Sequence, residues 1–199
     1  IGEETGQNFE WVLGAYYLDL SERNDITDLG TYSNPFSPWP PYIQNVNGTR
    51  NYDSENKALF GTFDYLLSET LTLSFGMRWE DWEANYDDSF GEEFSPSDQM
   101  LGGKISLIKD WSDEINLYAS IGRGYKAGGF NLGTGFSENL YSDRLIYDPE
   151  YLWNYEIGFN RQFADSSTNL DLVVFYSDRK DQQVMASTQV DPNDPNTFT

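Results

Sequence analysis

Hydrophobic and polar residues alternate along much of this chain with a period of two. The stretches 71–80 and 114–122 are the clearest examples, because every second residue in them is apolar. Side chains on a strand point alternately to opposite faces, so this pattern predicts two-faced β-strands. One face comprises Leu71, Leu73, Phe75, Ile115, Leu117, Ala119 and Ile121, and the other includes Thr72, Ser74, Asn116 and Ser120.

The same test predicts seven strands and no helix of useful length. Most of these strands reach the length of about 9–11 residues that a tilted membrane strand needs, whereas strands of soluble proteins cluster near about 5–6 residues. The expected strands are 9–20, 56–67, 71–85, 100–109, 114–126, 151–163 and 169–186.

Short and long connections between the strands alternate, which in an antiparallel meander puts all long loops at one end. Short turns on one rim and long loops on the other are typical of an outer-membrane barrel. We therefore predict an all-β fold, an antiparallel transmembrane β-barrel meander. The short turns are 68–70, 110–113 and 164–168, and the long loops are 21–55, 86–99 and 127–150.

Seven strands would leave two unpaired edges, which lipid does not tolerate. We expect a partial barrel whose missing strands precede Ile1, follow Thr199, or both. Aromatic rings near the strand ends could form the two girdles of such a barrel. The candidates are Trp79, Trp82 and Tyr86 near the long loops and Trp111 at a short turn.

Composition excludes several functions. The formal net charge is −21, so a nucleic acid would be repelled. The chain has no Cys and no His, which removes the common nucleophiles, bases and soft metal ligands. The acidic clusters lack the spacing of a calcium loop. We expect no enzymatic activity, no catalytic residue, no cofactor and no metal ion.

The long loops are rich in aromatic residues and prolines. Such rings can cover an apolar or planar ligand, and the prolines limit the entropy lost on binding. The alternative is that the rings pack the loops against one another over the barrel mouth. The candidate ligand-binding residues are Tyr32, Trp39, Tyr42, Phe130, Asn131, Tyr141 and Tyr147.

Two segments carry a resemblance to a known family. Residues 117–131, LYASIGRGYKAGGFN, together with 154–158, NYEIG, resemble the barrel of TonB-dependent outer-membrane receptors. The resemblance implies a barrel of about 22 strands with an N-terminal plug in its lumen. Residues 1–199 would then be part of the barrel domain, with the plug, the energy-coupling segment and the C-terminal strands outside this chain.

The resemblance also implies a function. It predicts an importer in the bacterial outer membrane that takes up a scarce nutrient such as a siderophore complex, cobalamin or an oligosaccharide. The implied partners are this small ligand, outer-membrane lipid and lipopolysaccharide, and the inner-membrane protein TonB, reached through the absent N-terminal region. The alternative hypothesis is a non-transporting, secreted β-sandwich module for carbohydrate binding or adhesion, which the acidic and aromatic composition would also suit.

Overall fold

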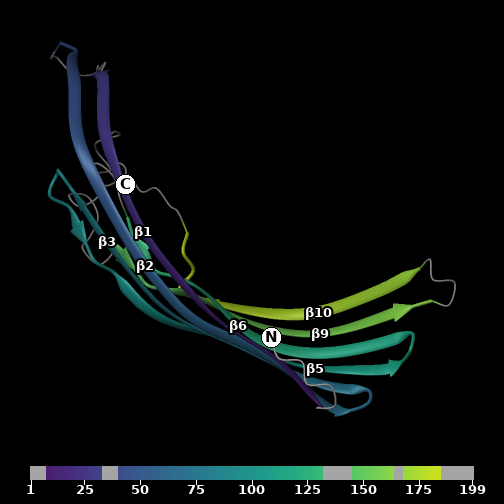
Figure 1. Cartoon of the computed structure of the whole chain (residues 1–199). Helices are drawn as coiled ribbons and strands as arrows, with labels where there is room; N and C mark the ends of the chain where they lie inside the picture. The colour runs from purple at the N-terminus through teal and green to yellow at the C-terminus, as the bar shows by residue number, and fades with distance from the viewer. Residues whose placement is uncertain (1–7, 33–39, 132–144, 164–167, 185–199) are drawn as a thin grey trace.

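The described part of the chain forms one large, strongly curved antiparallel sheet, to which a separate two-stranded sheet is added near the loops (Figure 1). The structure is a computed structural model that describes residues 8–32, 40–131, 145–163 and 168–184. No helix in these ranges is long and apolar enough to cross a membrane. In sheet order, the main strands are β1 (Phe9–Tyr32), β2 (Tyr42–Ser68), β3 (Leu71–Asp88), β5 (Ser97–Ser112), β6 (Ile115–Lys126), β9 (Glu150–Gln162) and β10 (Asn169–Lys180).

Each main strand pairs antiparallel with its neighbour in this order, so the predicted seven-stranded meander is confirmed. Three short elements belong to the connections. The two-residue strand β4 (Glu93–Phe94) pairs with β3, and β7 (Gly129–Phe130) pairs with β8 (Ile146–Tyr147). Within the described residues, β1 and β10 each have a partner on one side only, which is expected of a piece of a larger barrel.

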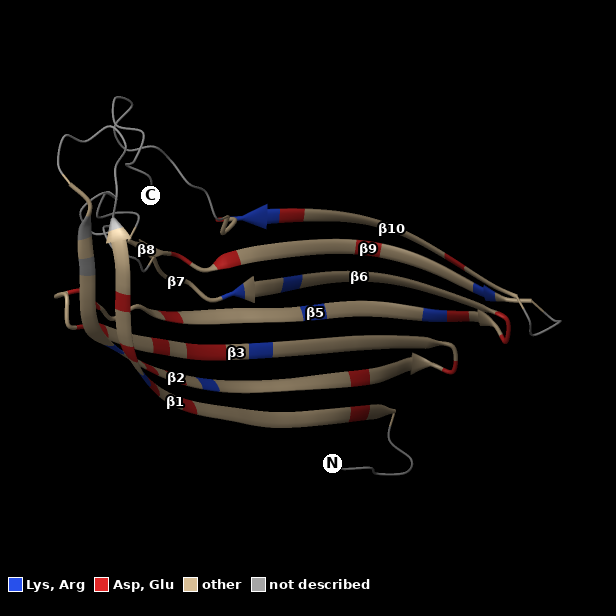
Figure 2. Ribbon diagram, turned by 90° about the horizontal axis from the view of Figure 1, so that it is seen from above, with Lys and Arg blue, Asp and Glu red and all other residues tan. Residues whose placement is uncertain are grey.

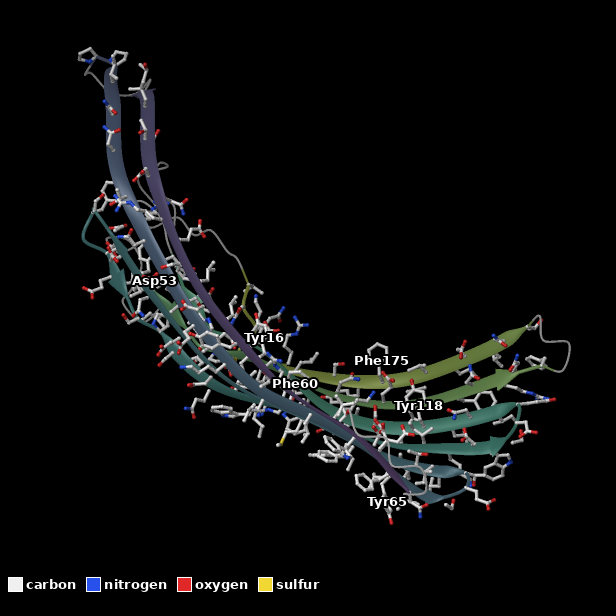
Figure 3. All side chains as sticks on the ribbon, viewed as in Figure 1. Tyr16, Asp53, Phe60, Tyr65, Tyr118 and Phe175 are labelled. Atoms are coloured by element: carbon white, nitrogen blue, oxygen red, sulfur yellow. The ribbon has the colours of Figure 1, made fainter. Side chains whose placement is uncertain are left out.

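The convex face of the sheet is apolar. Residues directly opposite one another on successive strands form rows, and two adjacent rows on this face contain only apolar and aromatic residues. Tyr65, in one of them, projects from the convex face (Figure 3). The rows are Trp11, Phe63, Phe75, Ile105, Ile121, Tyr155 and Tyr176, and Phe9, Tyr65, Leu73, Leu107, Ala119, Ile157 and Val174.

The concave face is mostly polar at the same level. Phe175 is the exception in the adjoining concave row, and it projects from this face in Figure 3. Most charged residues lie towards the strand ends, although β5 and β9 also carry charge near their middle (Figure 2). The sheet thus has an outer face suited to lipid and an inner face suited to a polar lumen. That concave row comprises Glu10, Asp64, Ser74, Ser106, Ser120, Glu156 and Phe175.

The apolar part of the convex face, which we call the apolar band, crosses the sheet obliquely. The first acidic residue beyond it on the convex face is Asp19 on β1 and Asp178 on β10. Strand pairing sets Asp19 level with Glu83 of β3, but Asp178 level with Met77. This shift of about 20 Å along the strands, over about 29 Å of sheet width, corresponds to a tilt of about 35°. Membrane barrels have strand tilts of about 35–45°.

Glycines on the concave face make room for aromatic rings. A Cβ on Gly14 would lie 2.3 Å from the ring of Phe60, its partner on β2. A Cβ on Gly158 would lie 2.0 Å from the ring of Tyr118, its partner on β6. Rings that cover strand glycines in this way pin the register of neighbouring strands. Tyr118 belongs to the family-like segment 117–131 and Gly158 to the segment 154–158, so this packing explains one residue of each segment.

The prediction of a long loop over residues 21–55 is wrong. β1 continues to Tyr32 and β2 begins at Tyr42, and the two strands stay paired without a register shift over this whole extension. Figure 1 shows the hairpin rising well beyond its neighbours. Most of the described residues in this extension are exposed to water, and they lie on both faces of the hairpin, so the extension does not need an alternation of apolar and polar residues. Pro40 and Pro41, which cannot donate ladder hydrogen bonds, directly precede β2.

Three smaller expectations also change. Most of the predicted loop 86–99 is strand or tight turn, with Gly91 at a φ of +97°. β10 ends at Lys180, and part of the predicted 164–168 turn lies outside the described residues. Trp79 does face outward at 37% exposure, but Trp82 and Tyr86 lie in concave rows and do not belong to a lipid-facing girdle.

A charge placed in the apolar band should destabilise the folded barrel. We expect Leu117→Arg in the full receptor to cost about 2–4 kcal/mol, because Leu117 lies on the convex face of β6, in the row that adjoins the one through Ala119. The matched control is Asn116→Arg, on the concave face, which should cost much less. Urea titrations of folding into lipid vesicles measure both values, and equal costs would contradict the assignment of the faces.

Candidate functional site

A cavity of about 430 Å³ lies on the concave face near the long-loop rim. This rim is the extracellular one in outer-membrane barrels. The cavity is built from strands distant in sequence: β1, β2 and β3 supply its wall, and the β7–β8 pair supplies the side nearer the loops. It is lined by Glu22, Asn24, Arg50, Tyr52, Trp82, Tyr86, Gly128, Gly129, Phe130 and Tyr147.

An aromatic cluster holds the β7 segment against the wall. The ring of Phe130 stacks on Phe94 with centroids 5.4 Å apart and an interplanar angle of 15°. It also contacts Tyr86 at 5.4 Å and Tyr52 at 6.2 Å. Tyr86 and Phe94 are buried. Such ring pairs contribute about 0.5–1.5 kcal/mol each beyond their area burial, so this cluster fixes the start of the 127–150 connection.

Two glycines allow β7 to approach β8 closely. A Cβ on Gly128 would lie 2.4 Å from the carbonyl oxygen of Tyr147, and one on Gly129 would lie 2.6 Å from the Tyr147 hydroxyl oxygen. The Gly128 N–H also donates to Asp98 Oδ2 at 3.3 Å. These glycines therefore serve close packing at the cavity, where Gly129 and Phe130 form the short strand β7.

Gln183 ties the segment after β10 to the same region. Its Nε2 donates to the carbonyl oxygens of Ala127 at 2.8 Å and Asp148 at 3.2 Å, and its backbone N–H donates to Glu150 Oε2 at 2.9 Å. Glu150 is also ion-paired with Arg179 at 3.2 Å. Gln183 thereby links the loop ends of β6, β9 and β10 through hydrogen bonds from its side chain and its backbone N–H.

The polar wall of the cavity contains a cation, Arg50. Nε of Arg50 is buried and has no hydrogen-bond partner among the described residues. Beside it, Trp82 Nε1 donates to Ser54 Oγ at 3.1 Å, and Asn24 Nδ2 donates to Glu22 Oε1 at 2.7 Å. The cavity therefore offers apolar rings together with a guanidinium group, a combination suited to an anionic ligand with apolar or planar parts.

A second polar cluster lies further along the concave face, towards the membrane. Glu80 accepts hydrogen bonds from Arg78 Nε and the Tyr125 hydroxyl, both at 2.7 Å, and from Asn56 Nδ2 at 2.6 Å. Glu80 is only 9% exposed. A carboxylate with this many donors is well compensated for its burial, so the cluster cross-links β2, β3 and β6.

The structure brings together only some of the predicted ligand-binding residues. Phe130 and Tyr147 line the cavity, and Asn131 adjoins it, with its N–H donating to the Leu145 carbonyl oxygen at 2.8 Å. Tyr32 and Tyr42 are opposite each other at the tip of the β1–β2 hairpin, about 27 Å along the strand from the cavity. Trp39 and Tyr141 lie outside the described residues.

Sequence reasoning missed Arg50, Trp82 and Tyr86 as cavity residues. Arg50 falls within the predicted loop 21–55, and the sequence predicts Trp82 and Tyr86 as girdle residues. The sequence does contain a signal for these three residues, which is their even numbering. Even-numbered residues of β2 and β3, such as Phe60 and Ser74, face the concave side, and this applies to the three residues once both strands are given their observed lengths.

The sloping apolar band, the polar concave face and the two open edges together define the class of protein: this is a segment of a transmembrane β-barrel. Residues 2–199 match the family model "TonB dependent receptor-like, beta-barrel". The chain belongs to this family, whose members are outer-membrane receptors and transporters rather than enzymes. The single curved sheet also argues against the β-sandwich alternative.

Individual proteins show the same relationship. The chain is 25% identical over 183 residues to the pesticin receptor of Yersinia enterocolitica, covering 88% of this chain and 25% of that protein. The ferric yersiniabactin uptake receptor FyuA of Yersinia pestis has a similar fold, with a TM-score of 0.67 at 22% identity over 92% of this chain and 27% of that one. The siderophore receptor PiuA of Acinetobacter baumannii gives a TM-score of 0.60 at 14% identity, with coverages of 87% and 29%.

Tyr86 provides a pH test of the aromatic cluster. Burial, followed by the hydrogen bond to Asp88, raises the pKa of Tyr86 to about 12. Because the folded state favours the neutral phenol, Tyr86 contributes stability below pH 10 that is lost as the pH rises towards 12. We expect wild type to lose stability over this window more steeply than Tyr86→Phe, measured by urea unfolding of the full receptor. Parallel curves would contradict the burial of this hydroxyl.

Proposed function

We propose that this chain is a wall segment of an energy-coupled outer-membrane importer whose ligand binds first at the cavity on the extracellular side of the concave face. The observation that carries the proposal is that cavity. It combines the rings of Tyr52, Phe130 and Tyr147 with the guanidinium of Arg50 on the inner face of a receptor barrel. A lumen that only conducted water or ions would have no need of a recess that combines aromatic rings with a guanidinium group.

The rest of the importer would lie outside this chain. The chain spans about a quarter of the length of the curated relatives that it matches. Because β1 and β10 each need a further partner in lipid, we propose that other strands of the same protein close the barrel. A plug and an energy-coupling segment that contacts TonB would complete it. The polar cluster around Glu80 faces the lumen, where a plug would pack.

Among the nutrient classes, a ferric siderophore complex is favoured over cobalamin or an oligosaccharide. The names of the similar proteins support this choice, because they include a siderophore receptor and a ferric yersiniabactin uptake receptor. The cavity supports it separately. Siderophore complexes with planar rings and a net negative charge would be held both by the aromatic residues and by Arg50.

The proposal is tested by iron uptake in cells that carry the full receptor as their only siderophore route. Radiolabelled ferric complexes of catecholate, hydroxamate and phenolate chelators are the probes. We expect at least one complex to bind and to be imported. Phe130→Ala or Tyr147→Ala should weaken its binding by about tenfold at most, since one ring contact is worth about 0.5–1.5 kcal/mol, and the double variant should weaken it more.

The matched control is Phe90→Ala. Phe90 is also an exposed ring on the extracellular side, but it lies at the β3–β4 turn and does not line the cavity. Its substitution should leave binding unchanged. If the cavity variants keep full affinity while saturated uptake falls, the β7–β8 pair gates passage and is not a recognition element. If no ferric complex binds and labelled cobalamin or an oligosaccharide does, the ligand class is wrong.

A further inference from the structure

The convex face contains a recess within its apolar band. Gly103 of β5 lies in an outward-facing row between Met77 and Arg123, and it leaves this row without a side chain. A Cβ there would lie 2.6 Å from the carbonyl oxygen of Gly76, so the close backbone approach of β3 and β5 excludes larger residues. The resulting groove of about 310 Å³ has mostly apolar walls, formed by Phe75, Met77, Leu101, Ile105, Ile121 and Trp153.

Arg123 stands at one end of this groove. It is the first outward-facing residue of β6 beyond the apolar Ile121, on the side of the long-loop rim. On β2, the residue in the equivalent place beyond Leu59 is Lys57, but Lys57 is ion-paired with Glu55. No ion pair joins Arg123 to a carboxylate in the described part of the chain, and its guanidinium is therefore available to an external anion.

The guanidinium of Arg123 is held in place by its neighbours. It lies 4.0 Å from the centroid of the Tyr151 ring and 5.9 Å from that of Trp153. Its Nη1 donates at 2.8 Å to the carbonyl oxygen of Leu101, which lies just beyond the last β5–β6 pair, Gly103 and Arg123. These contacts use one N–H group and one face of the guanidinium, and they leave further donors to bind an anion.

We propose that this groove and Arg123 form a binding site for lipopolysaccharide, in which Arg123 contacts a lipid A phosphate and the recess at Gly103 takes part of an acyl chain. The position of Arg123 supports this occupant. It lies at the extracellular edge of the band, level with the headgroups of the outer leaflet, which in an outer membrane is formed by lipopolysaccharide. In a chain with a net charge of −21, an unpaired arginine beside lipid is charge-complementary to a phosphorylated lipid.

Native mass spectrometry of the full receptor in mild detergent tests the site. The probes are bisphosphorylated hexa-acyl lipid A, its dephosphorylated form and phosphatidylglycerol. We expect Arg123→Gln to lower the affinity for bisphosphorylated lipid A about tenfold, the loss expected for a hydrogen bond between charged groups. Arg123→Lys should give an intermediate value, because it keeps the charge but loses the planar fork.

Lys57→Gln is the matched control, since it removes a cation from the same edge of the same face and should leave lipid A binding unchanged. Dephosphorylated lipid A should bind the wild-type receptor as weakly as bisphosphorylated lipid A binds Arg123→Gln. Equal affinity of wild type and Arg123→Gln for lipid A would overturn the proposal. So would equal affinity of wild type for lipid A and phosphatidylglycerol, because the site would then not distinguish lipopolysaccharide from other anionic lipids.

Should Arg123→Gln fail to fold, as judged by heat-modifiable migration on a gel, the wild-type receptor still decides the question. Equal binding of the bisphosphorylated and dephosphorylated lipids would then contradict a phosphate contact. None of these outcomes depends on which nutrient the receptor imports, so the lipid site and the proposed transport function can fail separately.

Discussion

Hydrocarbon cannot hydrogen-bond to a peptide group, and this constraint determines most of the structure. Each N–H and C=O within the bilayer must be paired inside the protein, so the chain crosses as strands that pair with their neighbours. Pairing in a sheet imposes the side-chain period of two, and the two environments then sort the residues. Apolar rows such as the one through Phe75 and Ile121 meet lipid, while the row through Ser74 and Ser120 meets the lumen.

The positions of the two proposed binding regions follow from the same sheet. The strands lengthen beyond the apolar band, and their concave rows there provide rings such as Tyr52 and Tyr86 for the cavity. Glycines, which have no side chain, shape both regions as well. Gly128 and Gly129 let the β7–β8 pair approach the wall, and Gly103 opens a recess in the lipid-facing surface.

The sequence predicted the bilayer part of the fold because alternation records which face meets lipid. Alternation predicts the seven main strands but not the short strands β4, β7 and β8, and it also predicts the outward positions of residues such as Leu73 and Ile115. Alternation is lost where both faces meet water, so the same test predicts a loop in place of the β1–β2 extension. The cavity was only partly predictable: Phe130 and Tyr147 stood out as loop aromatics, but Arg50 joins them only through pairing between strands distant in sequence.

The central claim is that the convex face meets lipid and the concave face meets water. Because this chain contains no cysteine, single cysteines can be introduced along β3 from 72 to 79 in a full receptor otherwise free of cysteine. Their reaction with a membrane-impermeant thiol reagent, in receptors refolded into vesicles, measures the exposure of each position to water. The account predicts reaction at even positions such as Ser74 and protection at odd positions such as Phe75, and uniform reactivity or the opposite parity would contradict it.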